Sequence, residues 1–307
     1  VAGGVALMLG CCGAISEWAG RYEMTEKVNE QLKQELAKLG DPIIIAGCPS
    51  CMKQLKESIG AHVIGIWEIL RKIGLPQQAK GLEIPVAIHD ACGARGDAQT
   101  QDMIRQLLSD MGCIVEDTEY SRDLSPCCGY GGLTAYANKD MAAKMTEKCL
   151  ERSDCPYITY CMACRDRFVR EGRESRHILE LLYGINAANM PDISEKRYNR
   201  LELKEKLLKN IWNEELMMEK KDYTVAYTED AISMMDERMI LKSDVECVLS
   251  DYRENQEAIF DEETKELVTR SRLGNVTFWV RFVETEEGYL VRRAYSHRMN
   301  IMKRVGQ

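Results

Sequence analysis

The sequence predicts an α/β protein of two similar lobes, followed by a small α+β domain. Cysteines are grouped in the same way twice, as Cys11-Cys12-Gly13 with Cys48-Pro-Ser-Cys51, and as Cys127-Cys128-Gly129 with Cys161-Met-Ala-Cys164. Each C-x-x-C motif follows a short apolar run and precedes a helix-like segment, which is typical of parallel α/β sheets. The last 118 residues contain one cysteine, and their pattern indicates helices and a β-hairpin.

The spacing of the cysteine groups indicates an internal repeat of about 115 residues. The interval from the Cys-Cys pair to the C-x-x-C motif is 36 positions in the first copy and 33 in the second. A similar helix-like segment follows each motif, and it places His62 and His177 at matched positions. A lone histidine usually packs or caps a helix, and we favour that role over metal binding for both.

The first lobe, residues 1–75, is predicted to alternate strands and helices. Residues 22–39 carry apolar side chains at helical spacing, and Gly40 and Pro42 end that helix. The remaining elements are a strand at Val5–Leu9, a strand at Pro42–Ala46, a helix after Cys48 and a helix at 61–73. The strands end at cysteines, as ligand sites of open α/β sheets do.

The second lobe, residues 76–188, is predicted to repeat this order. We expect strands at Ile84–His89, 113–117 and Tyr157–Tyr160, with helices reaching about Met111 and about Arg152. Two interpretations of His89, Asp90 and Arg95 stay open. They either tune a metal site through hydrogen bonds and charge, or they shape a turn, with Asp90 as a helix N-cap.

Residues 189–225 are read as a charged helical linker, and 226–307 as the α+β domain. The linker's apolar positions suggest one amphipathic helix: Leu201, Leu203, Leu207, Leu208, Ile211, Trp212 and Leu216. In the domain we expect two helices within 229–256, the second opened by a capping box at Ser243–Glu246. A hairpin is predicted from 276–283 and 289–295. His297 and the nearby aromatic residues could form a site, but core packing is favoured.

Composition limits the classes of function. The formal charge of −8 on 307 residues argues against a nucleic acid or an anionic membrane as partner. The apolar start is too short to span a bilayer. Thirteen clustered cysteines favour a reducing, cytoplasmic compartment and metal ligation over disulfides. A first residue of Val inside an apparent strand suggests that the native start lies further upstream.

The second cysteine group has five members, Cys92, Cys127, Cys128, Cys161 and Cys164. Thiolates select iron–sulfur clusters, zinc or copper(I). Because a structural zinc ion is saturated by four ligands, five thiolates favour a cluster of several irons. The alternatives are a zinc-stabilised interaction module, a thioredoxin-like C-x-x-C, and a phosphate-binding loop at 127–132. This loop lacks the Gly-Lys-Ser/Thr ending of a phosphate loop.

The motifs resemble those of the CCG domain family over about residues 5–185. The similar stretches are HDACGAR at 89–95, CCGYGG at 127–132 and GCPSC at 47–51. The family pattern is one cysteine, then Cys-Cys-Gly, then C-x-x-C. The family includes the B subunit of heterodisulfide reductase and the iron–sulfur subunits of glycolate and lactate oxidation systems.

The resemblance implies cofactors, a function and partners. The cofactors are 4Fe–4S clusters, held by Cys11, Cys12, Cys48 and Cys51 in the first lobe and by the five cysteines of the second. Those five are the catalytic group in a non-cubane cluster with bridging thiolates, unless one is a spectator beside an ordinary cubane. The implied function is an oxidoreductase that passes electrons, one per step, to a disulfide substrate. The alternative is a relay subunit without a substrate site. A flavoprotein or a ferredoxin-type subunit is the implied partner.

One expected ligand of the second lobe, Cys92, has no counterpart in the first lobe. Cys92 precedes Cys127 by 35 positions, and the matching position in the first copy falls about 24 residues before Val1. We therefore expect either a chain that begins downstream of its native start or a first site with four thiolates. The other cysteines fit no motif and are read as buried or incidental: Cys113, Cys149, Cys155 and Cys247.

Overall fold

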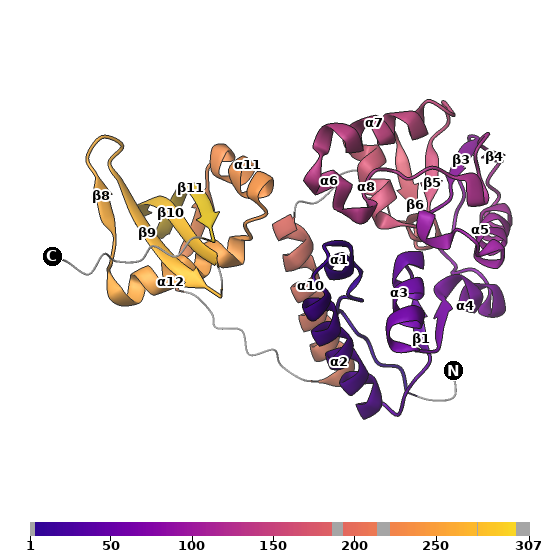
Figure 1. The fold of residues 1–307 in the computed structure, drawn as a ribbon, viewed down its shortest axis with the longest axis horizontal. Helices are drawn as coiled ribbons and strands as arrows, with labels where there is room; N and C mark the ends of the chain where they lie inside the picture. Colours follow the sequence, from indigo (N-terminus) through magenta and orange to yellow (C-terminus); the bar gives the residue numbers. More distant parts are fainter. Residues whose placement is uncertain (1–3, 186–192, 214–221, 275, 299–307) are drawn as a thin grey trace. The chain divides into compact units, whose positions relative to one another are not determined.

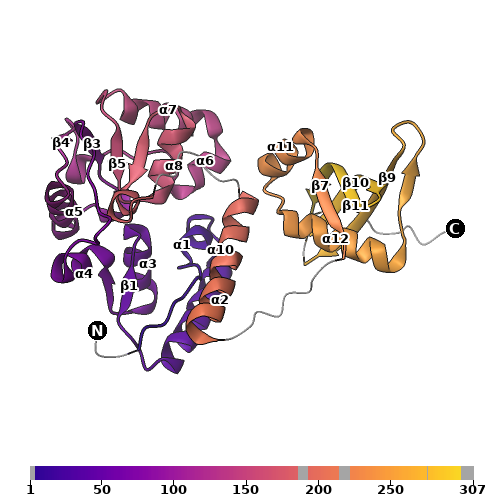
Figure 2. The same cartoon turned by 180° about the vertical axis from the view of Figure 1, so that it is seen from behind.

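The computed structural model of the chain describes residues 4–185, 193–213, 222–274 and 276–298. Contacts between residues divide the chain into two compact units, Val1–Met190 and Pro191–Gln307. Figures 1 and 2 show the elements of each unit from opposite sides. Each unit has its own hydrophobic core and is described by itself.

The first lobe of the first unit is a two-stranded parallel sheet with helices. Its elements are α1 (Ala14–Trp18), α2 (Tyr22–Lys38), β1 (Ile44–Ala46), α3 (Pro49–Ile59), β2 (Val63–Gly65) and α4 (Ile66–Ile73). The predicted helix at 22–39 and the strand before Cys48 are confirmed. The predicted helix at 61–73 is a strand followed by a shorter helix.

The second lobe is a parallel four-stranded sheet of order β4-β3-β5-β6. Its strands are β3 (Val86–His89), β4 (Val115–Asp117), β5 (Tyr157–Thr159) and β6 (Ser175–His177). Its α-helices are α5 (Ala98–Asp110), α6 (Thr134–Ala137), α7 (Lys139–Leu150), α8 (Met162–Arg170) and α9 (Ile178–Leu182). Three short 3₁₀ turns complete it: η1 (Cys92–Ala94), η2 (Arg122–Leu124) and η3 (Gly131–Leu133).

The internal repeat is present from each Cys-Cys-Gly motif onward. The series β1-α3-β2-α4 has the same order and parallel pairing as β5-α8-β6-α9. The expectation that His62 and His177 occupy matched positions of the repeat is wrong. His177 is the last residue of β6, whereas His62 precedes the equivalent strand, β2. Among the described residues, β1 pairs with β2 alone, whereas β5 lies between β3 and β6.

The expected strand at Val5–Leu9 is wrong, because these residues form no regular element. Their side chains are mostly exposed, and the described residues provide no strand to pair with them. An apolar run indicates a buried strand only where a neighbouring strand satisfies its backbone hydrogen bonds.

One core extends across both lobes and fixes them as one unit. Trp67 and Leu70 from the first lobe pack in the same cluster as Ile88, Ile104 and Tyr160 from the second. The rings of Trp67 and Tyr160 meet edge to face, with centroids 6.1 Å apart. The carboxyl ends of β1 and β5 are therefore held at fixed places relative to each other.

The second unit contains a five-stranded mixed sheet of order β7-β11-β10-β9-β8. Its helices are α10 (Ile193–Leu207), α11 (Glu229–Arg238) and α12 (Lys242–Asn255), with a π-helical turn η4 (Leu208–Trp212). Its strands are β7 (Thr224–Tyr227), β8 (Ile259–Asp261), β9 (Glu266–Leu273), β10 (Val276–Thr285) and β11 (Gly288–His297). The helices α11 and α12 pack on one face of the sheet. No helix in the described part of the chain has the length and apolar character needed to cross a membrane.

The predicted hairpin and the two helices within 229–256 are confirmed, but three details differ. The expected capping box at Ser243–Glu246 is wrong: the N-cap of α12 is Leu241, whose backbone N–H donates to the Asp244 carboxylate at 3.0 Å. Strand β7 extends across the predicted end of the linker. The linker helix is not clearly amphipathic, since Leu203 and Ile211 are exposed. The Trp212 side chain and Leu216 lie outside the described residues.

Candidate metal centre

The two Cys-Cys-Gly turns have the same local geometry. Gly13 and Gly129 adopt left-handed φ angles of 86° and 90°. In each turn the glycine N–H donates to the sulfur of the first cysteine, Cys11 or Cys127, at 3.4 Å. A Cβ on Gly129 would lie 2.6 Å from the carbonyl oxygen of Ala142. Glycine therefore lets this turn bring both thiols to one place.

The two C-x-x-C motifs are also superposable. Cys48 and Cys161 are the N-caps of α3 and α8, with φ and ψ of −134° and 121° in one and −133° and 119° in the other. The second cysteines, Cys51 and Cys164, lie in the first turns of these helices. Thiolates here are favoured because the first N–H groups of a helix are unpaired and the helix dipole is positive at this end.

Hydrogen bonds between thiols join the predicted cysteines in one run. In spatial order the run is Cys11, Cys12, Cys51, Cys48, Cys161, Cys164, Cys128, Cys127 and Cys92. The lobes meet at the bond between Cys48 and Cys161. The end members Cys11 and Cys92 are exposed to solvent. The structure thus brings together all nine cysteines that the sequence singled out.

Proton sharing divides the run into thiolates and thiols. Hydrogen bonds from neighbouring thiols lower the pKa of Cys12 to about 3. They lower the pKa of Cys48 and Cys127 to about 2. The thiols that donate these bonds, such as Cys51 and Cys92, have raised pKa values. Because metals bind thiolates, loading this site would release the remaining protons.

A close backbone approach aligns the two lobes at the site. A Cβ on Gly93, next to Cys92, would lie 2.7 Å from Ser50 Oγ and 2.8 Å from Ser50 N. Ser50 stands between the two cysteines of the first C-x-x-C motif. The second lobe's first turn therefore packs directly on the first lobe's ligand loop.

Asp90 connects the ligand-bearing segments of the second lobe. Its fully buried carboxylate accepts two hydrogen bonds from Arg105, at 3.0 and 2.8 Å. It also accepts from the Tyr160 hydroxyl at 2.9 Å and from the Arg122 backbone N–H at 2.6 Å. The Asp90 carbonyl accepts from Ser125 at 2.9 Å. One residue thus holds the segments that lead to Cys92, Cys127 and Cys161.

The structure distinguishes between the two interpretations of this turn. Asp90 caps no helix, because Ala91 precedes η1 and Asp97 is the N-cap of α5. Arg95 donates to the Ser125 carbonyl at 2.7 Å, so it also holds the segment before Cys127. Burial raises the pKa of Asp90, but the bonds from Arg105, Arg122 and Tyr160 outweigh it, and the net pKa is lowered.

Sequence reasoning missed a second support, at the Cys128 carbonyl. Thr146 Oγ1 donates to this oxygen at 2.8 Å, and Arg167 donates to Thr146 Oγ1 at 2.9 Å. Cys149, which fits no motif, donates its thiol to the Cys127 carbonyl at 3.5 Å. No local pattern marks these residues, since each lies about 20 or more positions from the cysteine that it supports.

The donor set fits a cofactor of several metal atoms. All nine members are thiols, which are the ligands of iron–sulfur clusters. Among the residues that the structure describes, no three His, Cys, Asp or Glu side chains gather around one point to hold a single metal ion. The buried Nε2 atom of His89, near Cys127, has no hydrogen-bond partner.

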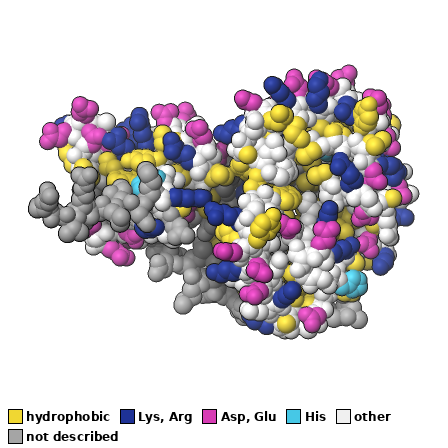
Figure 3. Space-filling model, viewed as in Figure 1, with side chains coloured by type: hydrophobic (Ala, Val, Ile, Leu, Met, Phe, Trp, Pro, Cys, Tyr) yellow, Lys and Arg dark blue, Asp and Glu magenta, His cyan; other side chains and the backbone are white. Residues whose placement is uncertain are grey.

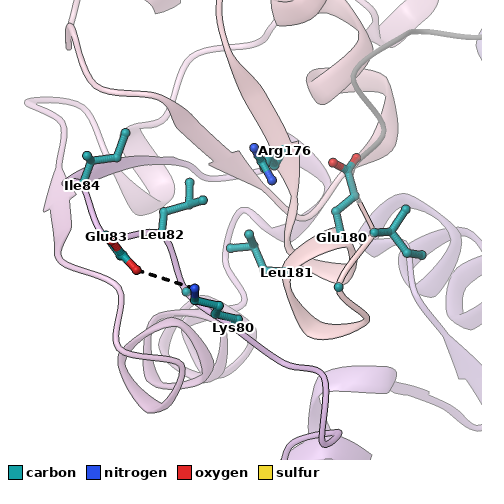
Figure 4. A pocket seen from close by; sticks show the side chains of 10 residues that line it. Lys80, Leu82, Glu83, Ile84, Arg176, Glu180 and Leu181 are labelled. Carbon is teal, nitrogen blue, oxygen red and sulfur yellow. Dashed lines mark ion pairs between the residues drawn. The ribbon is translucent and has the colours of Figure 1, made fainter.

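Two other features lie apart from the thiols. A pocket of about 440 Å³ is lined by Lys80, Glu83, Arg176 and Glu180 among others, and none of the nine cysteines lines it (Figure 4). In the second unit, Trp279 pairs with Tyr295 across the sheet and donates to His297 at 2.9 Å. Figure 3 shows hydrophobic side chains gathered on this unit, with Lys and Arg side chains around them. The expected core role of His297 and these rings is only partly right, since all three side chains are half-buried.

Two parallel-sheet lobes that present cysteines at strand ends define a cysteine-rich protein with an all-thiol ligand site. Residues 6–56 and 86–168 match the model of the cysteine-rich domain family, CCG. These two segments of the first unit are thus cysteine-rich CCG domain, as the motifs suggested.

One curated relative is similar over 161 residues with 27% identity, covering 50% of this chain and 32% of the relative. It is "Uncharacterized iron-sulfur protein MMP1067" of Methanococcus maripaludis. The chain thus spans about a third of that relative's length. No solved structure matches the chain.

Proposed function

We propose that the first unit is an electron-transferring iron–sulfur protein whose nine motif cysteines hold the iron. The observation that carries this proposal is the unbroken run of thiols through both lobes. A bound iron–sulfur cluster supplies one-electron redox chemistry. The chain's part is to present thiolates at two helix N-termini and to hold Cys48 beside Cys161, so that both sites lie close enough to exchange electrons.

The similar proteins support the same proposal. The relative from Methanococcus maripaludis carries an iron–sulfur name. The CCG motifs also resemble those of the heterodisulfide reductase B subunit and of glycolate and lactate oxidation subunits. A flavoprotein or a ferredoxin-type protein is the partner that this class of function requires.

Metal and sulfide analysis tests the proposal. The chain, reconstituted anaerobically with iron and sulfide, should retain both after desalting and give an electron paramagnetic resonance signal when reduced. Cys48→Ser and Cys161→Ser should each lower the iron content. Cys247→Ser is the matched control, because Cys247 is exposed and lies in the other unit. Zinc without acid-labile sulfide would favour the interaction module instead.

Disulfide reduction at the second site is a second candidate, favoured by the solvent exposure of Cys92. The reaction would take two electrons and two protons and convert one disulfide into two thiols. Protein supplied with a chemical electron donor should then consume a thiol disulfide as sole acceptor, and Cys92→Ser should abolish this turnover. A loaded protein that passes electrons to a flavoprotein but consumes no disulfide would be a relay subunit.

A further inference from the structure

The side chain of His89 lies on the face of the sheet that meets the second cysteine group. His89 ends β3, and Ala87 on the same face packs in one cluster with Cys128, Cys164 and Phe168. The imidazole ring meets the Phe168 ring edge to face, with centroids 4.8 Å apart. The field of Cys127 acts on the ring as well. His89 is therefore a neighbour of the site, although it follows no ligand spacing.

This imidazole has an unpaired polar atom in a buried place. The residue is 4% exposed, and its Nε2 has no hydrogen-bond partner. Leaving a buried polar group unpaired costs its full desolvation penalty, so native proteins rarely retain one without a reason. Burial lowers the pKa of His89 to about 4, so the ring stays neutral and carries one N–H at pH 7.

The other buried histidine of this unit provides an internal comparison. His177 is 2% exposed and also feels the charge of a site cysteine, Cys48. Its Nδ1 accepts from the Leu179 N–H at 3.2 Å, and it also bonds to the backbone of Tyr160. His177 is thus fully used as a helix cap, whereas Nε2 of His89 has no partner.

The adjacent carboxylate, Asp90, already accepts from Arg105, Tyr160 and Arg122, so it is not a free acceptor for the His89 ring. The charge of Cys127 acts on the ring, which makes the sulfurs of the second site candidate acceptors for it. Hydrogen bonds to cluster sulfurs are one of the main determinants of cluster potential.

Resting on the function proposed above, we propose that His89 is a positioning residue whose Nε2–H donates a hydrogen bond to a sulfur of the cluster held by Cys92, Cys127, Cys128, Cys161 and Cys164. The bond stabilises the reduced, more negative state of that site. The first lobe has a single histidine, His62, and it is exposed, so no buried histidine stands at the equivalent place there. His89 would therefore make the two sites unequal in potential.

The experiment measures the cluster and needs no turnover. In wild-type protein labelled with ¹⁵N-histidine, the reduced second site should show a ¹⁵N hyperfine coupling, unchanged in the His62→Gln control. His89→Phe keeps the ring contact with Phe168 but removes the donor. It should abolish the coupling and shift the midpoint potential of the second site to more negative values at unchanged iron content. His89→Gln, whose amide nitrogen reaches the position of Nε2, should restore most of the potential.

The outcomes separate this inference from the proposed function. A wild-type protein that retains no iron and sulfide would overturn both. A loaded wild-type protein without a histidine ¹⁵N coupling would overturn the role of His89 and leave the electron-transfer function standing. So would a His89→Phe variant whose second site keeps the wild-type potential.

Discussion

At the residue scale, Asp90 shows how one buried carboxylate organises distant segments. It accepts hydrogen bonds from residues 15, 32 and 70 positions away. Arg105 pairs with Asp90 in the interior and with Asp117 near the surface. These two carboxylates share one cation but differ in burial, so they form a matched pair for substitution.

The Asp90→Asn substitution should destabilise the metal-free protein by roughly 3–5 kcal/mol, because Arg105 loses its buried partner and keeps only the exposed Asp117. Asp117, whose side chain is 46% exposed, serves as the control. Asp117→Asn should cost under about 1 kcal/mol, as exposed ion pairs do. Urea unfolding measures both. If both variants lost the same free energy of unfolding, the buried pair of Asp90 would contribute no more than the exposed pair of Asp117.

The same residue predicts a pH dependence. The pKa of Asp90 is lower in the folded protein than in the unfolded chain. Its contribution to the free energy of unfolding is therefore complete above the unfolded pKa of about 4 and is lost as the pH falls through the folded pKa. The stability difference between wild type and Asp90→Asn should shrink in acid. A difference that stays constant from pH 7 to pH 3 would contradict this.

Gly129 tests the geometry of the Cys-Cys-Gly turn. Alanine there combines a φ of 90° with a contact of 2.6 Å to a backbone oxygen. Gly129→Ala should cost roughly 1–3 kcal/mol and lower the iron content of the second site. Gly131→Ala is the control, because its Cβ would meet only Cys127 Sγ, at 3.8 Å. The measurements are iron content and thermal unfolding. Equal iron contents and equal unfolding temperatures in the two variants would contradict this prediction.

At the element scale, the two C-x-x-C motifs use one device. In each motif a short strand leads to a cysteine that is the N-cap of the next helix. The strand places the thiol, and the positive end of the helix dipole favours its thiolate form. The pattern of an apolar run followed by a helical segment predicted both elements. The failed strand at Val5–Leu9 shows the limit of this reasoning, because an apolar run does not specify its pairing partner.

The contact between η1 and the start of α3 predicts the effect of one added methyl group. Gly93→Ala would force Ser50 and its helix away, because backbone atoms of Ser50 stand in the way. Such overpacking costs typically 1–3 kcal/mol. It should also loosen the contact between Cys48 and Cys161, so magnetic interaction between the two reduced sites should weaken. Gly10→Ala, whose Cβ would meet only its own neighbour Met8, is the control.

At the scale of the whole molecule, the two units have separate cores and separate chemistry. The second unit buries Val280, Phe282 and Val291 from its sheet against Val248 and Leu249 from α12. Its one cysteine, Cys247, is exposed, and within the residues that the structure describes it belongs to no group of three or more metal-binding side chains. The stability of this unit should therefore not depend on metal.

Residues 190–307 produced alone should unfold cooperatively in urea, with a midpoint unchanged by a chelator. Tryptophan fluorescence, to which Trp212 and the sheet residue Trp279 both contribute, follows the unfolding. Residues 1–190, in contrast, should lose stability when iron is removed, because ligand binding adds to the free energy of unfolding. A chelator-dependent midpoint in the C-terminal piece would show that this division is wrong.

The sequence by itself determined the grouping of the nine cysteines, the strand and helix on either side of each C-x-x-C motif, and the C-terminal hairpin. These features are local, since motif spacing and hydrophobic periodicity are legible within a few turns of chain. Only the tertiary structure decided that both cysteine groups form one run, that Asp90 anchors three segments, and that His89 has an unpaired nitrogen beside the thiols. Each of these depends on contacts between residues up to 113 positions apart, as Cys48 and Cys161 are, and no local pattern specifies which distant atoms will meet.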